Sequence, residues 1–257
     1  MGTLLMLAGY SKTGSSSIYQ THKNKPFIHP SNSHWKDETK FLVDYFPSYK
    51  HIVTDPILVR KTIEQYVDDY ADLLDQEENR GKVAVDFTTV NNLIDPEALA
   101  RLAEYSKGRL DIKVLLTLRH PVDRLNAIYC KLSDYLIEDN APLNMNPYML
   151  LQGQIKYEDT YNLFRQHFPI LVMDGLHYLK TFYRKKELSD LIGYELSSDP
   201  IVWSRITGKR MKENVQDGMI NPESEEGSIK NDWTEIVCAK YCSAYQEDIE
   251  TWKRLCF

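Results

Sequence analysis

The fold is decided near the start of the chain, where residues 3–19 read Thr-Leu-Leu-Met-Leu-Ala-Gly-Tyr-Ser-Lys-Thr-Gly-Ser-Ser-Ser-Ile-Tyr. The apolar run over residues 3–8 has the length of a buried strand. Residues 9–14 form a turn bounded by two glycines, and the three serines that follow are good helix caps. The stretch therefore predicts a strand, a loop and a helix in direct succession.

The same alternation continues along the rest of the chain. The apolar patterns predict further strands over residues 82–85, 112–118 and 169–173. Helices are predicted over residues 57–75, 96–105, 157–167 and 232–255, and another helical stretch opens at 174–176. Residues 26–40 and 199–230 are expected to be irregular. This order predicts an α/β fold with a mostly parallel sheet flanked by helices on both faces.

Ligands of such sheets bind beyond the carboxyl ends of the strands. The segments expected at that edge are residues 9–16, 86–89 and 119–124, together with Asp174.

Composition narrows the class of protein. The chain has 257 residues and no linker rich in Pro, Gly or Ser, so a single domain over residues 1–257 is expected. A formal charge of −6 argues against a nucleic-acid partner. There is no signal-peptide pattern and no apolar run of about 20 residues, so a cytoplasmic protein with no membrane partner is expected. The four cysteines match no zinc spacing and are expected to be free thiols.

The glycine-bounded loop has the chemistry of a phosphate cradle. Backbone N–H groups and the start of the following helix favour an anion, Lys12 adds a full charge, and Ser15 and Ser16 add hydroxyl donors. It is not a Walker A loop, because Lys12 precedes Gly14 instead of following it. The alternative is a Gly/Ser turn with a solvated lysine.

The loop resembles the 5′-phosphosulfate loop of sulfotransferases that use 3′-phosphoadenosine-5′-phosphosulfate (PAPS), typically G-x-x-K-[TSG]-G-[TS]-[TS]-x-[LI]. The likeness is greatest to the carbohydrate (heparan-type) branch and its bacterial or phage-like relatives. It implies a P-loop-like sulfotransferase fold. It also implies that PAPS is bound by the loop residues Lys12, Thr13, Gly14, Ser15 and Ser16.

A second segment, residues 118–129, resembles the family motif L-R-[ND]-P-[VA]-D-R-x-x-S-x-Y. The motif's first Arg and its Ser bind the 3′-phosphate, and they match Arg119 and Ala127 here; Asn126 is the candidate to replace the missing hydroxyl. Arg119 also stands out without the family, because a guanidinium at the end of a buried strand suits a phosphate. The alternative is an ion pair with Asp123, and for Arg124 a structural pairing with helical neighbours is favoured.

Two later segments extend the resemblance. Residues 168–176 and 191–193 are similar to the family's F-P-x-x-x-[LV]-x-x-E-D-L and F-L-G pattern, which implies an architectural role for Asp174. Gly208-Lys209-Arg210 is similar to the basic loop that covers the nucleotide, which implies that Lys209 and Arg210 bind PAPS. The alternative for that loop is a solvated basic surface.

The resemblance implies transfer of a sulfuryl group from PAPS to an acceptor hydroxyl or amine, on a small molecule or a glycan, without a metal. Lys12 would stabilise charge on the bridging oxygen. The general base is less defined, because the family's Glu would fall on Ser31 or Asn32. The candidates in that region are His34, His29, Asp37 and Glu38. Cytosolic sulfotransferases use a histidine as base, which makes His34 chemically reasonable. The alternative for each candidate, favoured for each taken alone, is a loop residue in solvent.

Asp86 is a further catalytic candidate, since an acid at a strand's carboxyl edge can reach an acceptor; a cap or turn is the alternative. Two other functions stay open. One is a P-loop kinase or NTPase, because residues 83–86 also resemble a Walker B strand that holds Mg²⁺. The other is a nucleotide-binding protein without catalysis.

Overall fold

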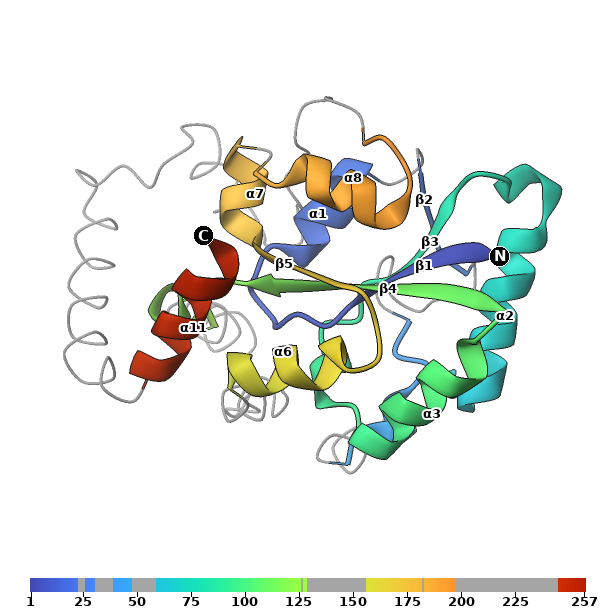
Figure 1. Ribbon diagram of the computed structural model, residues 1–257, viewed down its shortest axis with the longest axis horizontal. Coiled ribbons are helices and arrows are strands. Elements are labelled where there is room, and N and C mark those ends of the chain that lie inside the picture. Colours follow the sequence, from blue (N-terminus) through green and yellow to red (C-terminus); the bar gives the residue numbers. More distant parts are fainter. Residues whose placement is uncertain are drawn as a thin grey trace, which may run out of the picture.

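A parallel sheet lies at the centre of the chain. The structure is a computed structural model that describes residues 1–22, 26–30, 39–47, 59–125, 127–128, 156–181, 183–196 and 245–257. Within these residues five strands pair in the order β2-β3-β1-β4-β5, and every neighbouring pair is parallel (Figure 1). The strands are β1 (Gly2–Leu7), β2 (Phe27–Ile28), β3 (Val83–Asp86), β4 (Leu110–Leu118) and β5 (Ile170–Asp174). The predicted parallel sheet is confirmed.

Strand β1 is central because its side chains are apolar on both sides. Leu4, Leu5, Met6 and Leu7 are all fully buried. Leu4 and Met6 pack into the core on one face, and Leu5 and Leu7 pack into the core on the other. A strand without polar alternation suits the interior of a sheet that is covered on both faces.

Helices cover both faces, as predicted. On one face lie α1 (Ser15–His22), α7 (Gly175–Thr181) and α8 (Lys185–Ile192), and on the other lie α2 (Ile63–Asp75), α3 (Pro96–Ser106) and α6 (Tyr157–Arg165) (Figure 1). Helix α11 (Gln246–Cys256) packs against β5 and α6. Three short 3₁₀ turns span Val43–Tyr45, Glu77–Asn79 and Asn91–Leu93, and residues 121–125 are also helical.

Helix α2 follows the apolar spacing and capping residues of its sequence. Its predicted apolar positions Ile63, Val67, Tyr70 and Leu74 are all buried. The helix begins only at Ile63, because Thr62 forms a capping box with Gln65: the Thr62 hydroxyl accepts from Gln65 N, and the Gln65 side chain accepts from Thr62 N.

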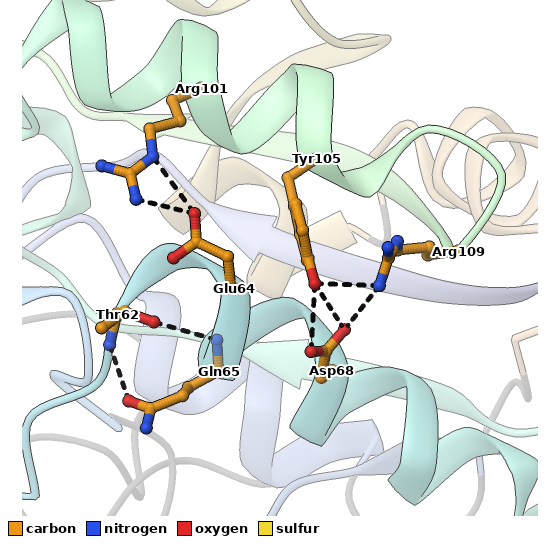
Figure 2. A network of polar contacts seen from close by, with 7 residues as sticks. All are labelled: Thr62, Glu64, Gln65, Asp68, Arg101, Tyr105 and Arg109. Carbon is orange, nitrogen blue, oxygen red and sulfur yellow. Dashed lines mark hydrogen bonds and ion pairs between the residues drawn. The ribbon is translucent and has the colours of Figure 1, made fainter.

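The outer faces of α2 and α3 are joined by polar contacts (Figure 2). Arg101 donates to Glu64 at 2.7 Å, and Asp68 accepts from both Tyr105 and Arg109. These side chains are largely exposed, so each pair contributes little, about 0–1 kcal/mol.

The structure departs from the sequence predictions in three places. The expected irregular region contains the two-residue strand β2, which pairs with β3. The helical stretch after β5 is two helices, α7 and α8, separated at Arg184, which has a left-handed φ of 55°. The closing helix is described only over Gln246–Cys256, and residues 232–244 of the predicted range lie outside the described residues.

Candidate functional site

The candidate site is the 9–16 loop, which joins β1 to α1 at the carboxyl edge of the sheet. Ala8 N still donates to Leu115 O of β4 at 2.9 Å, and the chain then turns away from the sheet. Lys12 adopts a left-handed φ of 68° and Gly14 a φ of 92°. Gly14 O accepts from Ser17 N and Ile18 N at 3.1 Å, which starts α1. The predicted strand, loop and helix are therefore confirmed.

Two glycines let the loop lie directly against its neighbours. A methyl group on Gly9 would lie under 3.0 Å from the Thr117 hydroxyl of β4, with Thr117 O at 3.0 Å. A methyl group on Gly175, the first residue of α7, would collide with the backbone carbonyl of Thr13. Real Cβ atoms do not approach other atoms so closely. Both positions thus require glycine, because Gly9 packs against the side chain and backbone of Thr117 and Gly175 packs against the backbone of Thr13.

The Thr13 side chain shapes the loop. It is fully buried, and its Oγ1 donates to Tyr10 O at 2.6 Å and lies 2.8 Å from Thr117 Oγ1. The hydroxyl therefore points into the protein. If Thr13 binds a ligand, it does so through its backbone N–H.

The start of α1 has the character of an anion site. Its first turn contains no acidic residue. Ser15 is buried, whereas Ser16 and Lys12 are half-buried. The first N–H groups of a helix carry a partial positive charge, and Lys12 adds a full one. This end of the loop can hold an anion on backbone and side-chain donors together.

Arg119 connects the second motif with the first. It directly follows β4, which is the neighbour of β1 in the sheet. Its Nη1 donates to Lys12 O at 3.2 Å, and its own carbonyl accepts from the Tyr157 hydroxyl at 2.9 Å. Lys12, Thr13, Gly14, Ser15, Ser16 and Arg119 thus lie together at one point of the sheet edge.

Arg124 has contacts that the sequence did not indicate. It is only 6% exposed, its Nε donates to Ser11 O at 3.2 Å, and its guanidinium lies 4.6 Å from the Tyr10 ring centroid. The favoured prediction was a pairing with neighbours on its own helix. The structure instead gives Arg124 partners in the 9–16 loop, so the predicted helical partners are wrong.

The Tyr10 side chain anchors the loop to residues 156–160, at the start of α6. Its hydroxyl lies 2.7 Å from Thr160 Oγ1 and donates to Lys156 O at 3.1 Å, and its ring contacts that of Tyr157 at 4.8 Å. Burial raises the pKa of the Tyr10 phenol well above its usual value, and the hydrogen bond with Thr160 opposes only part of that rise. Tyr10 is therefore a neutral anchor between the loop and α6.

Asp86 lies at the end of β3, on the predicted edge, but its carboxylate faces inward. It is 1% exposed. Oδ1 accepts from Thr88 N at 3.0 Å and Thr88 Oγ1 at 2.6 Å, and Oδ2 accepts from Tyr66 at 2.8 Å and Asn91 at 3.4 Å. These contacts favour the turn alternative over the catalytic one, because the oxygens already have donors. The Thr88 hydroxyl in turn accepts from the backbone N–H groups of Thr39 and Lys40.

Asp174, at the end of β5, has the architectural contacts that the resemblance implied. Its Oδ1 accepts from His177 N at 2.7 Å in the first turn of α7, and its Oδ2 accepts from Trp252 Nε1 of α11 at 2.8 Å. The carboxylate therefore ties two helices to the strand end.

Several predicted site residues lie outside the described part of the chain: His34, Asp37, Glu38, Asn126, Lys209 and Arg210. His29 is described, half-buried, with Nδ1 3.0 Å from Pro30 O. Ala127 is described in a helical turn.

In the described ranges no three His, Cys, Asp or Glu side chains are grouped as metal ligands, and no helix is long and apolar enough to cross a membrane. Cys256, the cysteine described, is a buried free thiol.

A surface depression elsewhere on the molecule does not belong to this site. It is lined by Met1, Asp68, Asp72, Asp75 and Arg109, among others. Met1 precedes β1, so the depression lies at the amino end of that strand, whereas the 9–16 loop follows its carboxyl end.

Comparison with known proteins supports the fold. A crystal structure of a sulfotransferase from Alicyclobacillus acidocaldarius matches with a TM-score of 0.55 over 98% of this chain and 99% of that chain, at 15% sequence identity. This chain shares its fold with a sulfotransferase. The predicted α/β sulfotransferase fold is thereby confirmed. No protein-family model and no curated protein matches the sequence.

Proposed function

We propose that the chain is a sulfotransferase that moves a sulfuryl group from PAPS to an acceptor hydroxyl or amine, with a glycan among the candidate acceptors. One observation carries the proposal: the two anion motifs of the sequence meet, with the Arg119 guanidinium on the carbonyl of Lys12. A nucleotide with phosphate groups at both its 5′ and 3′ positions needs two cationic sites close together. The shared fold of a sulfotransferase adds support.

The residues divide the chemistry between them. The acceptor oxygen or nitrogen attacks sulfur, the bond between sulfur and the bridging oxygen breaks, and the nucleotide leaves as 3′-phosphoadenosine-5′-phosphate (PAP). The Lys12 ammonium is proposed to stabilise the charge that grows on the bridging oxygen. The N–H groups at the start of α1 and the serine hydroxyls are proposed to hold the 5′-phosphosulfate, and Arg119 the 3′-phosphate.

The acceptor proton must pass to a base, for which His34 is the proposed residue. Lys209 and Arg210 remain the predicted cover of the nucleotide.

The kinase alternative rests on Asp86, and its contacts weaken that alternative. A Walker B carboxylate orients Mg²⁺ or its water ligands. In this chain both Asp86 oxygens accept hydrogen bonds from Thr88, Tyr66 and Asn91. The position of Lys12 before Gly14 argues in the same direction.

Calorimetry and a transfer assay test the proposal together. PAP should bind in the presence of EDTA, and more tightly than ATP with Mg²⁺. Radiolabelled PAPS should then transfer its label to one member of a panel of hydroxyl and amine acceptors. Loss of PAP binding on chelation, or preference for ATP with Mg²⁺, would favour the kinase alternative. PAP binding without transfer to any acceptor would favour the non-catalytic alternative.

A further inference from the structure

The starting observation is a buried positive charge beneath the 9–16 loop. Arg124 is 6% exposed and follows β4 in the helical residues 121–125, where its N–H donates to His120 O at 2.9 Å. Its charge interacts with the carboxyl group of Asp248, and its side chain also hydrogen-bonds the Tyr157 phenol. A buried guanidinium is costly unless its donors are used. Its contacts with Ser11 O and the Tyr10 ring join these in holding the guanidinium in place.

The two arginines of this segment bind consecutive carbonyls. Arg124 Nε donates to Ser11 O, and Arg119 Nη1 donates to Lys12 O, each at 3.2 Å. Ser11 O belongs to the peptide unit before the Lys12 Cα, and Lys12 O belongs to the unit after it. The orientations of these two planar units set φ and ψ of Lys12. Both peptide units thus accept hydrogen bonds from guanidinium groups of a segment more than 100 residues away, which restrain the two torsions.

This matters because Lys12 has an unfavourable backbone. Its φ of 68° is in the left-handed region, which a residue with a Cβ adopts at a cost on the order of 1 kcal/mol. In the absence of the two donated hydrogen bonds, the loop would relax toward commoner conformations. The direction of the Lys12 side chain would then change with its backbone.

The same hydrogen bonds orient the neighbouring amides. The described peptide bonds include none in the cis form, so each N–H points opposite to the carbonyl of its own unit. With Ser11 O and Lys12 O turned toward the arginines, the N–H groups of Lys12 and Thr13 turn away from them. Consecutive N–H groups around a left-handed residue form a concave anion site.

We propose that Arg124 is a positioning residue that, together with Arg119, holds Lys12 in the conformation that reaction and anion binding require. The inference rests on the proposed function for what Lys12 does, but the backbone clamp itself can be tested without it. Arg124 acts through the Ser11 carbonyl, beneath the loop. In this way an arginine of residues 118–129 helps to set the conformation of the 9–16 loop.

The test is a double-mutant cycle of single-turnover sulfuryl transfer. Arg124→Met removes the donor and the charge, and should slow transfer by about 10- to 100-fold, the value of one hydrogen bond involving a charged group. In a Lys12→Ala background the same change should have a several-fold smaller effect, because the lysine side chain it positions is gone and only the orientation of the N–H groups is still lost. Equal losses in both backgrounds would overturn the proposal and leave Arg124 with a purely structural role.

Two variants act as controls. Arg124→Lys keeps the charge but not the planar donor, so it should transfer sulfuryl groups almost as slowly as Arg124→Met. If Arg124→Met does not fold, Arg124→Lys is used in its place in the double-mutant cycle. Arg101→Met removes an arginine that is exposed and donates to Glu64 on the face shown in Figure 2. That variant should transfer sulfuryl groups like the unmodified protein. Full activity of Arg124→Lys and Arg124→Met would refute the clamp.

Hydrogen exchange separates a failed clamp from a failed function. In the ligand-free protein, amides of residues 11–14 should exchange at least about tenfold faster in Arg124→Met, while the amides of β4 keep their protection. Unchanged exchange in residues 11–14 would overturn the proposal. If exchange rises but the unmodified protein neither binds PAP nor transfers sulfate, the clamp stands and the proposed function fails.

Discussion

A single methyl group on Gly175 should displace the candidate phosphate site. Gly175 opens α7, more than 150 residues from the 9–16 loop, yet its added Cβ would collide with Thr13 O and lie 3.0 Å from Thr13 C. A backbone carbonyl cannot rotate away alone. Thr13 is also fixed through its hydroxyl to Tyr10 and Thr117. In Gly175→Ala the loop and α7 must therefore separate by a distance on the order of 1 Å, since a carbon rarely approaches an oxygen closer than normal contact distance.

The size of the effect follows from that displacement. Moving a binding or catalytic group by about 1 Å can cost on the order of 100-fold in rate. Overpacking a well-filled site costs about 1–3 kcal/mol of folding free energy. Gly175→Ala should thus bind PAP far more weakly, and turn over far more slowly, than its modest loss of stability explains.

The assay is calorimetric titration with PAP, beside thermal unfolding of the same preparation. Gly108→Ala is the matched control: Gly108 has a φ of 73° in the turn before β4, and an added Cβ meets nothing within 4 Å. It should lose about 1 kcal/mol of stability through backbone strain and keep its PAP affinity. If Gly175→Ala binds PAP as tightly as Gly108→Ala does, the close packing of the loop on α7 does not control the site.

Three further predictions concern the site edge and the core. Arg119→Ala should weaken PAP binding far more than binding of adenosine 5′-phosphosulfate, which lacks the 3′-phosphate; equal losses in titrations of the two ligands would give Arg119 a structural role. Asp86→Asn should lower the free energy of unfolding by about 1–3 kcal/mol, because an amide cannot accept hydrogen bonds from all four donors. Turnover per folded molecule should slow by less than about tenfold. A loss of turnover of about 100-fold or more would make Asp86 the general base. Burial raises the pKa of five tyrosines, Tyr10, Tyr66, Tyr70, Tyr157 and Tyr178. Above pH about 10 the unfolded chain therefore releases phenol protons that the folded protein keeps. The free energy of unfolding should fall as the pH rises through this range. Urea unfolding between pH 8 and about 11 tests this, and a flat profile would contradict it.

Most of the fold could be predicted because its strands and helices carry strong local patterns. Residues 3–8 and 112–118 are long apolar runs, and both are strands of the central sheet. The α2 spacing and the Pro96 start of α3 follow from capping and periodicity. By contrast, β2 is only two residues long and exists because Val83 N and its neighbours pair with it. Local sequence holds no signal for such tertiary pairing.

The positions of the candidate site residues could be predicted from the sequence better than the contacts of their side chains. Strand order brought Lys12 and Arg119 together as expected. Residue type alone could not show that the Thr13 hydroxyl points inward or that the Asp86 oxygens are filled. Gly175 and Arg124 were missed as residues that shape the loop, although a glycine directly after a strand was a usable signal. Their importance comes from contacts between segments far apart in the chain.

Single-turnover sulfuryl transfer by Lys12→Ala, measured beside the affinity of that variant for PAP, tests the role of Lys12 directly. The ammonium should matter most when charge grows on the bridging oxygen. Turnover should therefore fall by about 10²–10³-fold, whereas PAP, which lacks the sulfuryl group, should lose affinity by a smaller factor. Lys12→Arg should restore little activity, because a guanidinium presents its donors differently. Turnover of Lys12→Ala close to that of the unmodified protein would contradict the assignment of the 9–16 loop and, with it, the proposed sulfotransferase.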